Sequence, residues 1–379
     1  MDPIPLIVGA GPVGLAAALF LSHRGVTARI IEADHEPHPI HQSRALAVNP
    51  RTLDLLEHTG VSARMLERGG RLRGASFRRG DRLITAPDFS DLRHTRPFML
   101  ALSQAVSERL LEEALAERGV RVERGARFTG CREQGELGGA TIERHGVTET
   151  VACPWILGAD GARSVVRATI GAEFPGSKMR RTWRLADVAL RSPLERDRAY
   201  GYLLKGGGFL ALIPVVTDIR SEPARPIWRL ITDREDPIAQ LRVAGAEAAA
   251  APAWESSFQV SHRLASRFQH GRVSLAGDAS HIHSPIGARG MNLGVEDAYV
   301  FADLAARGEL SSYENARRAV DSGVVRRVEF ITRLIAGESP LSFLQRTPAP
   351  SIAMRIAPVR RRLLQTVAGL DHDLPNMPG

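Results

Sequence analysis

Three glycine-rich stretches in this chain combine small residues with acidic or basic side chains in a way that suits a negatively charged ligand. They are residues 9–14 (GAGPVG), residues 158–167 (GADGARSVVR) and residues 277–294 (GDASHIHSPIGARGMNLG). Backbone amides at a glycine-rich turn that opens a helix point at an anion, and the helix N-terminus adds partial positive charge. The stretches lie far apart in the sequence, so the fold must bring them together if they act on one ligand.

The first stretch has the surroundings that a dinucleotide-binding turn requires. Residues 4–8 (IPLIV) predict a buried parallel strand, residues 15–25 predict a helix, and the next apolar run ends in Glu32. A strand, a glycine turn, a helix and a second strand ending in an acid are typical of a Rossmann-type unit. We expect the carboxylate of Glu32 to accept hydrogen bonds from an adenosine ribose.

Each glycine of this turn has a separate expected task. Gly9 makes the tight turn, Gly11 lets the backbone approach a pyrophosphate, and Gly14 lets the helix pack closely on the strand. The pattern by itself does not separate FAD from NAD.

The second and third stretches repeat this arrangement with different side chains. In the second, an apolar strand precedes Asp160, and a helix carrying Arg163 and Arg167 follows. In the third, the strand 272–276 is followed by Gly277 and Asp278, and a second glycine turn opens an apolar-periodic helix. Asp278 suits a sugar-alcohol hydroxyl, and the amides at the start of that helix suit a carbonyl or ring oxygen. We expect three points of contact along one long ligand.

The three motifs in this order resemble the FAD-dependent aromatic hydroxylases, the single-component flavoprotein monooxygenases of the para-hydroxybenzoate hydroxylase type. Residues 41–60 and 100–119 and the stretch LSSYENARRAV resemble further segments of that family, so the resemblance covers about residues 4–320. It implies that the first motif holds the ADP half of FAD and the third holds the ribityl chain and flavin ring. It also implies that Arg163 and Arg167 lie on the NAD(P)H path, the alternative being a solvated helix face. The residues expected at FAD are Gly9, Gly11, Pro12, Val13, Gly14, Glu32, Arg44, Gln104, Asp160, Asp278, Gly287, Ala288, Gly290, Met291 and Asn292.

The resemblance implies an activity as well as a cofactor. NADPH or NADH reduces FAD, O2 adds to the reduced flavin, and the resulting flavin hydroperoxide hydroxylates a phenolic or polycyclic aromatic small molecule. Baeyer–Villiger oxygenation or epoxidation on the same scaffold, a flavin-dependent reductase and a flavin-binding redox sensor remain alternatives, because function depends on the pocket rather than the fold.

The same resemblance implies a fold of α/β type with an added antiparallel sheet. We expect a discontinuous Rossmann-like FAD-binding domain over residues 1–70, 100–176 and 267–330. Short alternating strands in residues 71–99 and 177–266 predict an inserted, mostly antiparallel substrate-domain sheet. Residues 200–215 predict a hairpin that turns at residues 206–208, and residues 235–253 an exposed helix or linker. Residues 331–379 predict a C-terminal helical cap of proline-separated helices.

Candidate substrate-side residues are fewer. A phenolic substrate needs a base or hydrogen-bond acceptor, and His283 and the backbone around Pro285 are the candidates. Tyr202, Phe209 and Trp228 are candidates for the pocket wall, although sequence parity does not decide which face of the sheet each occupies. We expect His281 to be a structural hydrogen bonder and expect no metal site, since no third ligand accompanies the two histidines.

Composition excludes several other classes. The 379 residues carry 50 basic and 42 acidic side chains, a net charge of +8, but they are interspersed without a long basic run, so we expect no nucleic-acid partner. Arginine in excess suits an anionic cofactor. Two cysteines allow no disulfide framework, and no signal peptide or long apolar segment occurs, so we expect a cytoplasmic protein that does not bind membranes. A monomer and a homodimer remain equally open.

Overall fold

The computed structural model describes residues 4–37, 39, 45–134, 137–221, 225–342, 347 and 349–374. Arg44, which the family resemblance places near the flavin, lies outside these residues. Within them, no helix is both long and apolar enough to cross a membrane.

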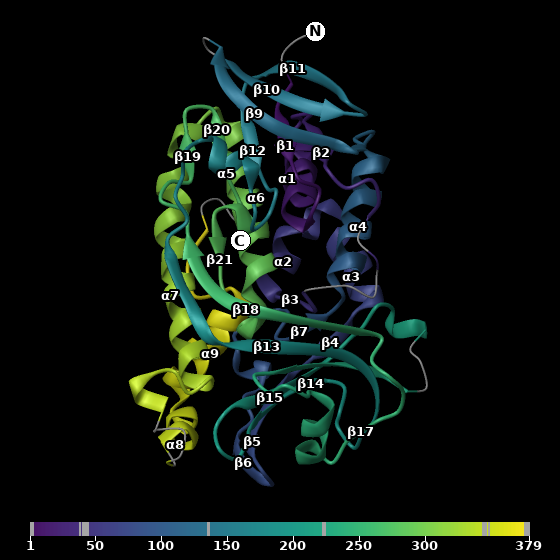
Figure 1. Ribbon diagram of the computed structural model, residues 1–379, viewed down its shortest axis with the longest axis vertical. Helices are drawn as coiled ribbons and strands as arrows, with labels where there is room; N and C mark the ends of the chain where they lie inside the picture. The colour runs from purple at the N-terminus through teal and green to yellow at the C-terminus, as the bar shows by residue number, and fades with distance from the viewer. Residues whose placement is uncertain are drawn as a thin grey trace.

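The first glycine motif belongs to a largely parallel sheet that forms one half of the elongated molecule (Figure 1). Its strands lie in the order β19 (Gln269–His270), β20 (Val273–Leu275), β12 (Ile156–Gly158), β1 (Leu6–Val8), β2 (Arg29–Glu32) and β8 (Val122–Arg124). All neighbours pair in parallel except β19 and β20. β1, β12 and β20 are buried throughout, as expected for strands covered on both faces.

The strand order explains how the three glycine stretches come together. β20, β12 and β1 are neighbours and run in the same direction, so their carboxyl ends share one edge of the sheet. The first stretch follows β1, the second follows β12 and the third follows β20. In open α/β sheets this edge is the ligand-binding edge.

Helices cover this sheet. α1 (Pro12–His23) packs against α6 (Arg289–Ala306) and α4 (Gln104–Glu117), and α5 (Val165–Thr169) follows the second motif. Residues 13–21 of α1 are all buried, which a helix at the centre of a domain requires. A separate antiparallel sheet of β9 (Ala126–Gln134), β10 (Leu137–Arg144) and β11 (Val147–Cys153) lies at the end of this half.

The other half is built on a large, mostly antiparallel sheet. Its strands lie in the order β21 (His281–Ile282), β18 (Trp254–Leu264), β13 (Gly176–Arg191), β16 (Ile227–Thr232), β15 (Phe209–Pro214), β14 (Arg198–Leu203), β5 (Gly74–Arg79) and β6 (Arg82–Thr85), and β17 (Glu247–Ala248) pairs with β13. Only β14 and β5 pair in parallel within this described sheet. The hairpin expected over residues 200–215 is confirmed by the β14–β15 pairing, with residues 206–208 at the turn.

The two faces of the large sheet pack against different partners. One face carries Trp183, Phe209 and Ile231 and contacts Ile286 of the third motif and the end of α7. The other face packs against residues 238–246; its main side chains are Ala186, Val188, Tyr200, Tyr202, Leu210, Leu212, Trp228 and Leu230. Only the first face therefore borders the glycine motifs.

The remaining elements connect the two halves or lie near the C-terminus. They are β3 (Ala47–Val48), α2 (Pro50–Leu55), α3 (Val61–Arg68), β4 (Gly70–Leu72), β7 (Met99–Ala101), α7 (Tyr313–Ile335), α8 (Ala349–Arg355) and α9 (Ala357–Ala368). The expected α-helix or linker over residues 235–253 is wrong in detail. Residues 238–244 form a 3-10 helix, and the alanine-rich stretch contributes β17, because Leu241, Ala244 and Ala246 are buried against the large sheet.

Candidate functional site

The first glycine motif has little space at two positions and open space at the third. A Cβ on Gly9, whose φ is +103°, would lie 2.5 Å from the carbonyl oxygen of Ala159, and one on Gly14 would lie 1.9 Å from the oxygen of Gly9. A Cβ on Gly11 would meet nothing within 4 Å. Gly9 and Gly14 are therefore required by packing, whereas Gly11 leaves the backbone open on the ligand side.

Gly11 is also the N-cap residue of α1, and Pro12 is the first residue of this helix. The first amides of a helix have no intrahelical acceptor and carry the positive end of the helix dipole. The backbone around Gly11 therefore presents donors and space to an anion, which fits a pyrophosphate.

Glu32 stabilises this turn from the end of β2. Its Oε2 accepts the amide hydrogen of Ala10 at 2.8 Å, and its Oε1 accepts that of Asp34 at 3.0 Å. The carboxylate borders a hollow lined by Ala10, Glu32, Asp34, Glu36, Pro37, Ala105, Glu108, Arg109, Glu112 and Arg124. A carboxylate oxygen accepts more than one hydrogen bond, so Glu32 fixes the turn and still suits a ribose hydroxyl.

Gln104 begins α4 beside the same hollow. Its Oε1 accepts the amide hydrogen of Ala45 at 3.1 Å, and its Nε2 donates to Glu108 at 2.8 Å. The side chain therefore anchors the chain that follows residue 44, and this placement leaves its expected contact with FAD a prediction.

Two polar side chains of the second motif, those of Asp160 and Arg167, bind within the protein. Asp160 accepts hydrogen bonds from the Ser164 hydroxyl at 2.5 Å and from the amide of Val165 at 2.7 Å, so it caps α5. Burial raises the pKa of this carboxyl above its ordinary value. Arg163 is exposed, whereas Arg167 donates to the carbonyl of Ala279 at 3.0 Å and thereby links the second motif to the third.

The first and third motifs meet through Val13. A Cβ on Gly277 would lie 2.8 Å from Val13 Cγ2, and one on Gly294 would lie 2.4 Å from the same atom. Gly277 also has a φ of +60° and donates its amide hydrogen to Asp297 at 2.9 Å. Two glycines of the third motif thus make room for a side chain of the first, and α1 and α6 cross at this point.

The acidic residue that follows β20, Asp278, is accessible. Asp278 is exposed while both of its neighbours are buried. An acid at the tip of β20, beside the α1–α6 crossing, is placed to meet a ligand hydroxyl on the binding edge.

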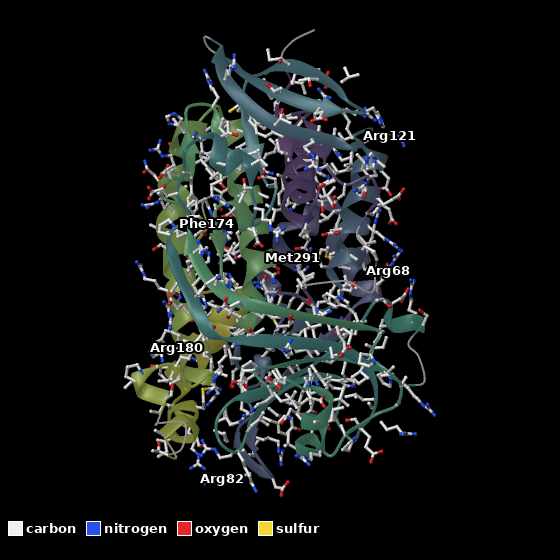
Figure 2. All side chains as sticks on the ribbon, viewed as in Figure 1. Arg68, Arg82, Arg121, Phe174, Arg180 and Met291 are labelled. Carbon is white, nitrogen blue, oxygen red and sulfur yellow. The ribbon has the colours of Figure 1, made fainter. Side chains whose placement is uncertain are left out.

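The turn before α6 has an unusual backbone. Gly287 and Ala288 both have left-handed φ values, +80° and +52°, and α6 begins at Arg289. Met291 lies in the first turn of α6, in the central part of the molecule (Figure 2). The amides at residues 289–291 are those that a helix start leaves without intrahelical acceptors, which suits a carbonyl or ring oxygen.

The side chain of Asn292 is used within the protein, and the expected contact of its backbone amide with FAD stays a prediction. The Asn292 side chain is fully buried; Oδ1 accepts the amide hydrogen of Asn49 at 3.0 Å, and Nδ2 donates to the carbonyls of Ala47 at 3.0 Å and Ala288 at 2.6 Å. The side chain therefore braces the turn before α6, and only the backbone of residue 292 remains on the ligand side. Gly290 is close to His283, since a Cβ on it would lie 3.8 Å from His283 Cε1.

His283 carries a buried acceptor that no described residue satisfies. Its Nδ1 lies 2.9 Å from the carbonyl oxygen of Ser284. A carbonyl only accepts, so Nδ1 holds the proton and Nε2 has the lone pair, and Nε2 is buried without a hydrogen-bond partner. Burial lowers the pKa of His283 to about 3, so the ring is neutral at physiological pH. The Pro285 carbonyl accepts from Ala288 at 3.0 Å and is used in the turn itself.

Two further residues with buried polar atoms, His262 and Trp183, were not singled out from the sequence. His262 on β18 would pair with His283 if the β18–β21 register continued by one residue, and both of its ring nitrogens are buried without partners among the described residues. Burial lowers the pKa of His262. The indole Nε1 of Trp183 is likewise buried without an acceptor. The sequence does not predict these groups, because the alternation of a strand does not show which face of the sheet borders the cofactor half.

The expected pocket residues do not lie together. Phe209 packs edge-on against Trp183, with ring centroids 4.6 Å apart, on the face that borders the third motif. Tyr202 and Trp228 occupy the opposite face with the segment 238–246. The structure therefore brings one of the three aromatic candidates to the cofactor side, and the other two are sheet core.

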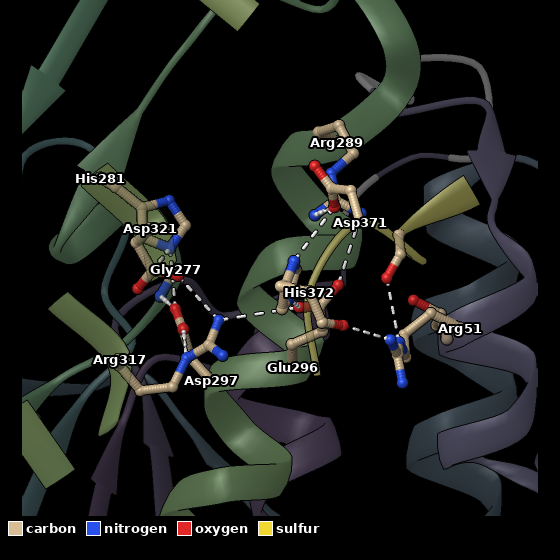
Figure 3. A network of polar contacts seen from close by, with 12 residues as sticks. Arg51, Gly277, His281, Arg289, Glu296, Asp297, Arg317, Asp321, Asp371 and His372 are labelled. Atoms are coloured by element: carbon tan, nitrogen blue, oxygen red, sulfur yellow. Dashed lines mark hydrogen bonds and ion pairs between the residues drawn. The ribbon is translucent and has the colours of Figure 1, made fainter. Parts of the chain in front are cut away.

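A network of buried charges lies behind the third motif (Figure 3). Asp297 accepts from His281 Nε2 at 2.8 Å and from Arg317 Nε at 2.7 Å, and Arg317 also binds Asp321 at 2.7 Å. These carboxylates raise the pKa of His281 to about 9 against the effect of burial. His281 is thus a structural hydrogen bonder, as the sequence indicated. Although ligand atoms of His281, Asp297 and Asp321 lie within 4.8 Å of one another, Arg317 already binds both acids.

The chain is similar to known proteins over nearly all of its length. Residues 5–328 match the family described as the FAD binding domain. The chain is 34% identical to the 6-methylpretetramide 4-monooxygenase of Streptomyces rimosus over 95% of its own length and 67% of the relative's. The chain belongs to the FAD-dependent aromatic hydroxylase family. The chain is also 35% identical to the aromatic compound monooxygenase YhjG of Bacillus subtilis, over 87% of its own length and 68% of that relative's.

A solved structure agrees with these relatives. The anhydrotetracycline hydroxylase from Streptomyces rimosus superposes with a TM-score of 0.78 at 27% identity, over 99% of this chain and 78% of that one. The fold expected from the sequence, a Rossmann-like FAD-binding part with an antiparallel sheet and C-terminal helices, is confirmed. The protein is an FAD-dependent monooxygenase, an oxidoreductase that incorporates one oxygen atom and takes electrons from NAD(P)H. The glycine cradles, the two helix starts and Glu32 fit FAD.

Proposed function

We propose that this monooxygenase hydroxylates a phenolic or polycyclic aromatic small molecule. The observation that carries the proposal is the unpartnered, buried Nε2 of His283, which lies next to the glycine-rich start of α6. A buried acceptor without a donor costs free energy, so a ligand that supplies an O–H is favoured there. The relatives support the choice of an aromatic substrate, since the names of two of them specify an aromatic compound or a tetracycline-type ring system.

The chain's own residues have distinct tasks in this reaction. FAD, when bound, would accept electrons from NAD(P)H and transfer one oxygen atom from O2 to an electron-rich ring. Gly11 and Glu32 bind the ADP part, and Asp278 with the α6 amides binds and orients the rest. His283 accepts the hydrogen bond of the substrate hydroxyl at Nε2 and so increases electron density on the ring. Because its pKa is about 3, His283 polarises this hydroxyl without becoming a stable imidazolium.

The apolar face of the large sheet supplies the substrate wall. Phe209, Trp183 and Ile286 lie together on the face that borders the third motif. Large aromatic surfaces bind flat rings and exclude water, which protects the oxygen-transfer step from side reactions. Arg163 and Arg167 remain candidates for the NAD(P)H path, although Arg167 already binds the carbonyl of Ala279.

We also propose how the chain divides and where it acts. An FAD-binding part over residues 1–70, 100–176 and 267–330 and a substrate sheet over 71–99 and 177–266 follow the two halves of Figure 1, with residues 331–379 as a helical cap. Cytoplasmic NAD(P)H suits a cytoplasmic enzyme. A monomer or homodimer suffices, because every residue used above comes from one chain.

The test is the anaerobic rate of flavin reduction by NADPH and by NADH, measured with and without phenols, quinolones and polycyclic quinols. We expect one aromatic class to accelerate reduction and to yield a product carrying one atom from labelled O2. His283→Ala should lower product formation while leaving FAD bound. Equal reduction rates with every aromatic, together with no labelled product, would contradict the proposal and favour a reductase.

A further inference from the structure

The turn that presents α6 to the flavin is held by the C-terminal segment of the chain, residues 367–372. Ala288 in this turn packs against the same buried cluster as Val367 and Leu370, and a Cβ on Gly287 would lie 3.8 Å from Val367 Cγ2. Segments about 80 residues apart in the chain therefore lie side by side at the expected flavin position.

Polar contacts tie the same segment to α6. His372 Nε2 lies 2.6 Å from Glu296 Oε2, and His372 Nδ1 lies 3.0 Å from Asp371 Oδ1. Arg289, the first residue of α6, lies 3.5 Å from Glu296 and 3.7 Å from Asp371. Its side chain is fully buried, so the only basic residue of the GARG turn points into the protein instead of toward a phosphate (Figure 3).

Two other helices hold this segment from the outside. Arg51 of α2 donates to the carbonyls of Gly369 at 3.0 Å and His372 at 2.7 Å. Arg327 of α7 pairs with Asp371 at 2.6 Å. A Cβ on Gly369 would lie 2.6 Å from an Arg289 nitrogen, so the segment approaches the start of α6 as closely as its backbone permits.

The turn itself needs support from outside. Ala288 has a φ of +52°, a conformation that costs a residue with a Cβ free energy and persists only where the surroundings enforce it. Asn292 supplies one restraint through its 2.6 Å hydrogen bond to the Ala288 carbonyl. The C-terminal segment approaches the turn through Val367 and contacts Arg289, the residue that follows the turn, through Asp371.

We propose that His372 and Asp371 are positioning residues for the flavin, because they fix Glu296 and Arg289 and thereby keep the 287–288 turn in its left-handed conformation. The segment touches the protein side of the turn, whereas the amides of residues 289–291 face the ligand. FAD affinity therefore depends on a part of the chain that contains none of the glycine motifs. The inference rests on FAD binding at the start of α6.

The test is the dissociation constant of FAD, titrated into apoprotein of the full chain and followed by flavin fluorescence. His372→Leu removes both hydrogen bonds of the ring, and we expect the dissociation constant to rise at least tenfold. Asp373→Asn changes the adjacent exposed residue and should stay within twofold of the unchanged protein. If His372→Leu does not fold, His372→Gln is measured in its place.

A double variant separates positioning from general stability. Ala288→Gly removes the conformational cost of the left-handed turn, so adding it to His372→Leu should recover most of the lost FAD affinity. Wild-type affinity in His372→Leu overturns the proposal. Loss of affinity that Ala288→Gly does not recover also overturns it, because the effect is then structural. Failure of the unchanged chain to bind FAD would instead contradict the proposed function.

Discussion

Val13 fills the space that a side chain at Gly294 would need, with its Cγ2 2.4 Å from the position of a Cβ there. The contact joins the start of α1 to α6, and it exists because glycines 277 and 294 leave room for it. Two helix starts are thereby held at one ligand edge, and each offers amide donors and partial positive charge.

Replacing Gly294 tests this contact directly. Gly294→Ala should destabilise the protein by about 1–3 kcal/mol, because an added methyl in a packed site forces a shift. FAD affinity should fall as well, and Val13→Ala in the same chain should restore part of both. Urea unfolding and FAD titration are the measurements. As a control, Gly323→Ala lies in the middle of α7 and should be neutral or mildly stabilising. Unchanged stability in Gly294→Ala would contradict the crossing.

The carboxylate of Glu32 should matter through the backbone that it holds. Glu32→Ala removes the hydrogen bonds to Ala10 and Asp34, each worth about 1.5–3 kcal/mol when one partner is charged. We expect FAD to bind at least tenfold more weakly by titration of the apoprotein. Glu36→Gln alters another acid of the same hollow that has no such role, and equal losses in both variants would assign the effect to charge alone.

His283 should act as a neutral group throughout the working pH range. Its folded pKa of about 3 predicts that no step changes in rate between pH 5 and 9 because of this ring. His283 acts here as a hydrogen-bond acceptor, and a hydrogen bond between neutral groups is worth about 0.5–1.5 kcal/mol. We therefore expect His283→Ala to slow product formation by about two- to tenfold, in single-turnover measurements with saturating substrate. An unchanged rate would remove His283 from the reaction.

The same pKa also predicts how stability depends on pH. The unfolded chain binds a proton at about pH 6.5, whereas folded His283 binds one only near pH 3. This histidine therefore contributes stability above pH 6.5 that is lost as the pH falls, and His262, whose pKa is also lowered, acts in the same direction. Urea unfolding between pH 4.5 and 6.5 should show that the free energy of unfolding changes less steeply with pH in His283→Phe than in the unchanged protein. Identical slopes would contradict a buried neutral ring.

Arg317 should be the most costly charge to remove. It binds Asp297 and Asp321 in a fully buried network, so Arg317→Gln removes the guanidinium charge that both acids share, although Asp297 keeps His281 and the Gly277 amide. Breaking a buried pair costs about 3–5 kcal/mol. The neighbouring Arg318 is half exposed and pairs only weakly with Glu314 at 3.8 Å, so Arg318→Gln should change stability by less than about 1 kcal/mol. Thermal and urea unfolding compare the two, and similar losses would be inconsistent with the buried network.

The two faces of the large sheet should respond differently to substitution. Phe209→Leu lies on the face toward the third motif and should change the KM for the aromatic substrate several-fold. Trp228→Phe lies on the opposite face and should lower stability while leaving KM within about twofold. Steady-state kinetics together with unfolding curves distinguish the outcomes. A change in KM only in Trp228→Phe would place the substrate on the other face.

Local patterns in the sequence were sufficient for the elements that carry the cofactor. The spacing of Gly9, Gly11 and Gly14 between an apolar strand and a helix has one common structural meaning, because each glycine answers a separate steric demand. The hairpin around residues 206–208 was equally readable, since three consecutive glycines between alternating strands permit only a turn. Glu32 stands at the end of β2, where a ribose-binding acid belongs.

The uses of individual polar side chains were decided by tertiary packing. Gln104 holds Ala45, and Asn292 binds Ala47 and Asn49, because each found these partners on a segment that the sequence does not place beside it. Arg289, the basic residue of the third motif, lies against Glu296 and, for the same reason, against Asp371. Asp160 instead caps α5 through Ser164, which lies four residues away in the same motif.

The sequence by itself determined the three cradles, because glycine, strand and helix signals are local and their spacing is set by backbone geometry. FAD and the family followed from the resemblance that the three motifs carry in this order. Only the tertiary structure decided which face Phe209, Tyr202 and Trp228 occupy, since a period of two fixes alternation but not direction. It likewise decided that the segment 367–372 supports the flavin turn. That contact joins distant parts of the chain through buried charged side chains, and no local sequence pattern predicts their pairing.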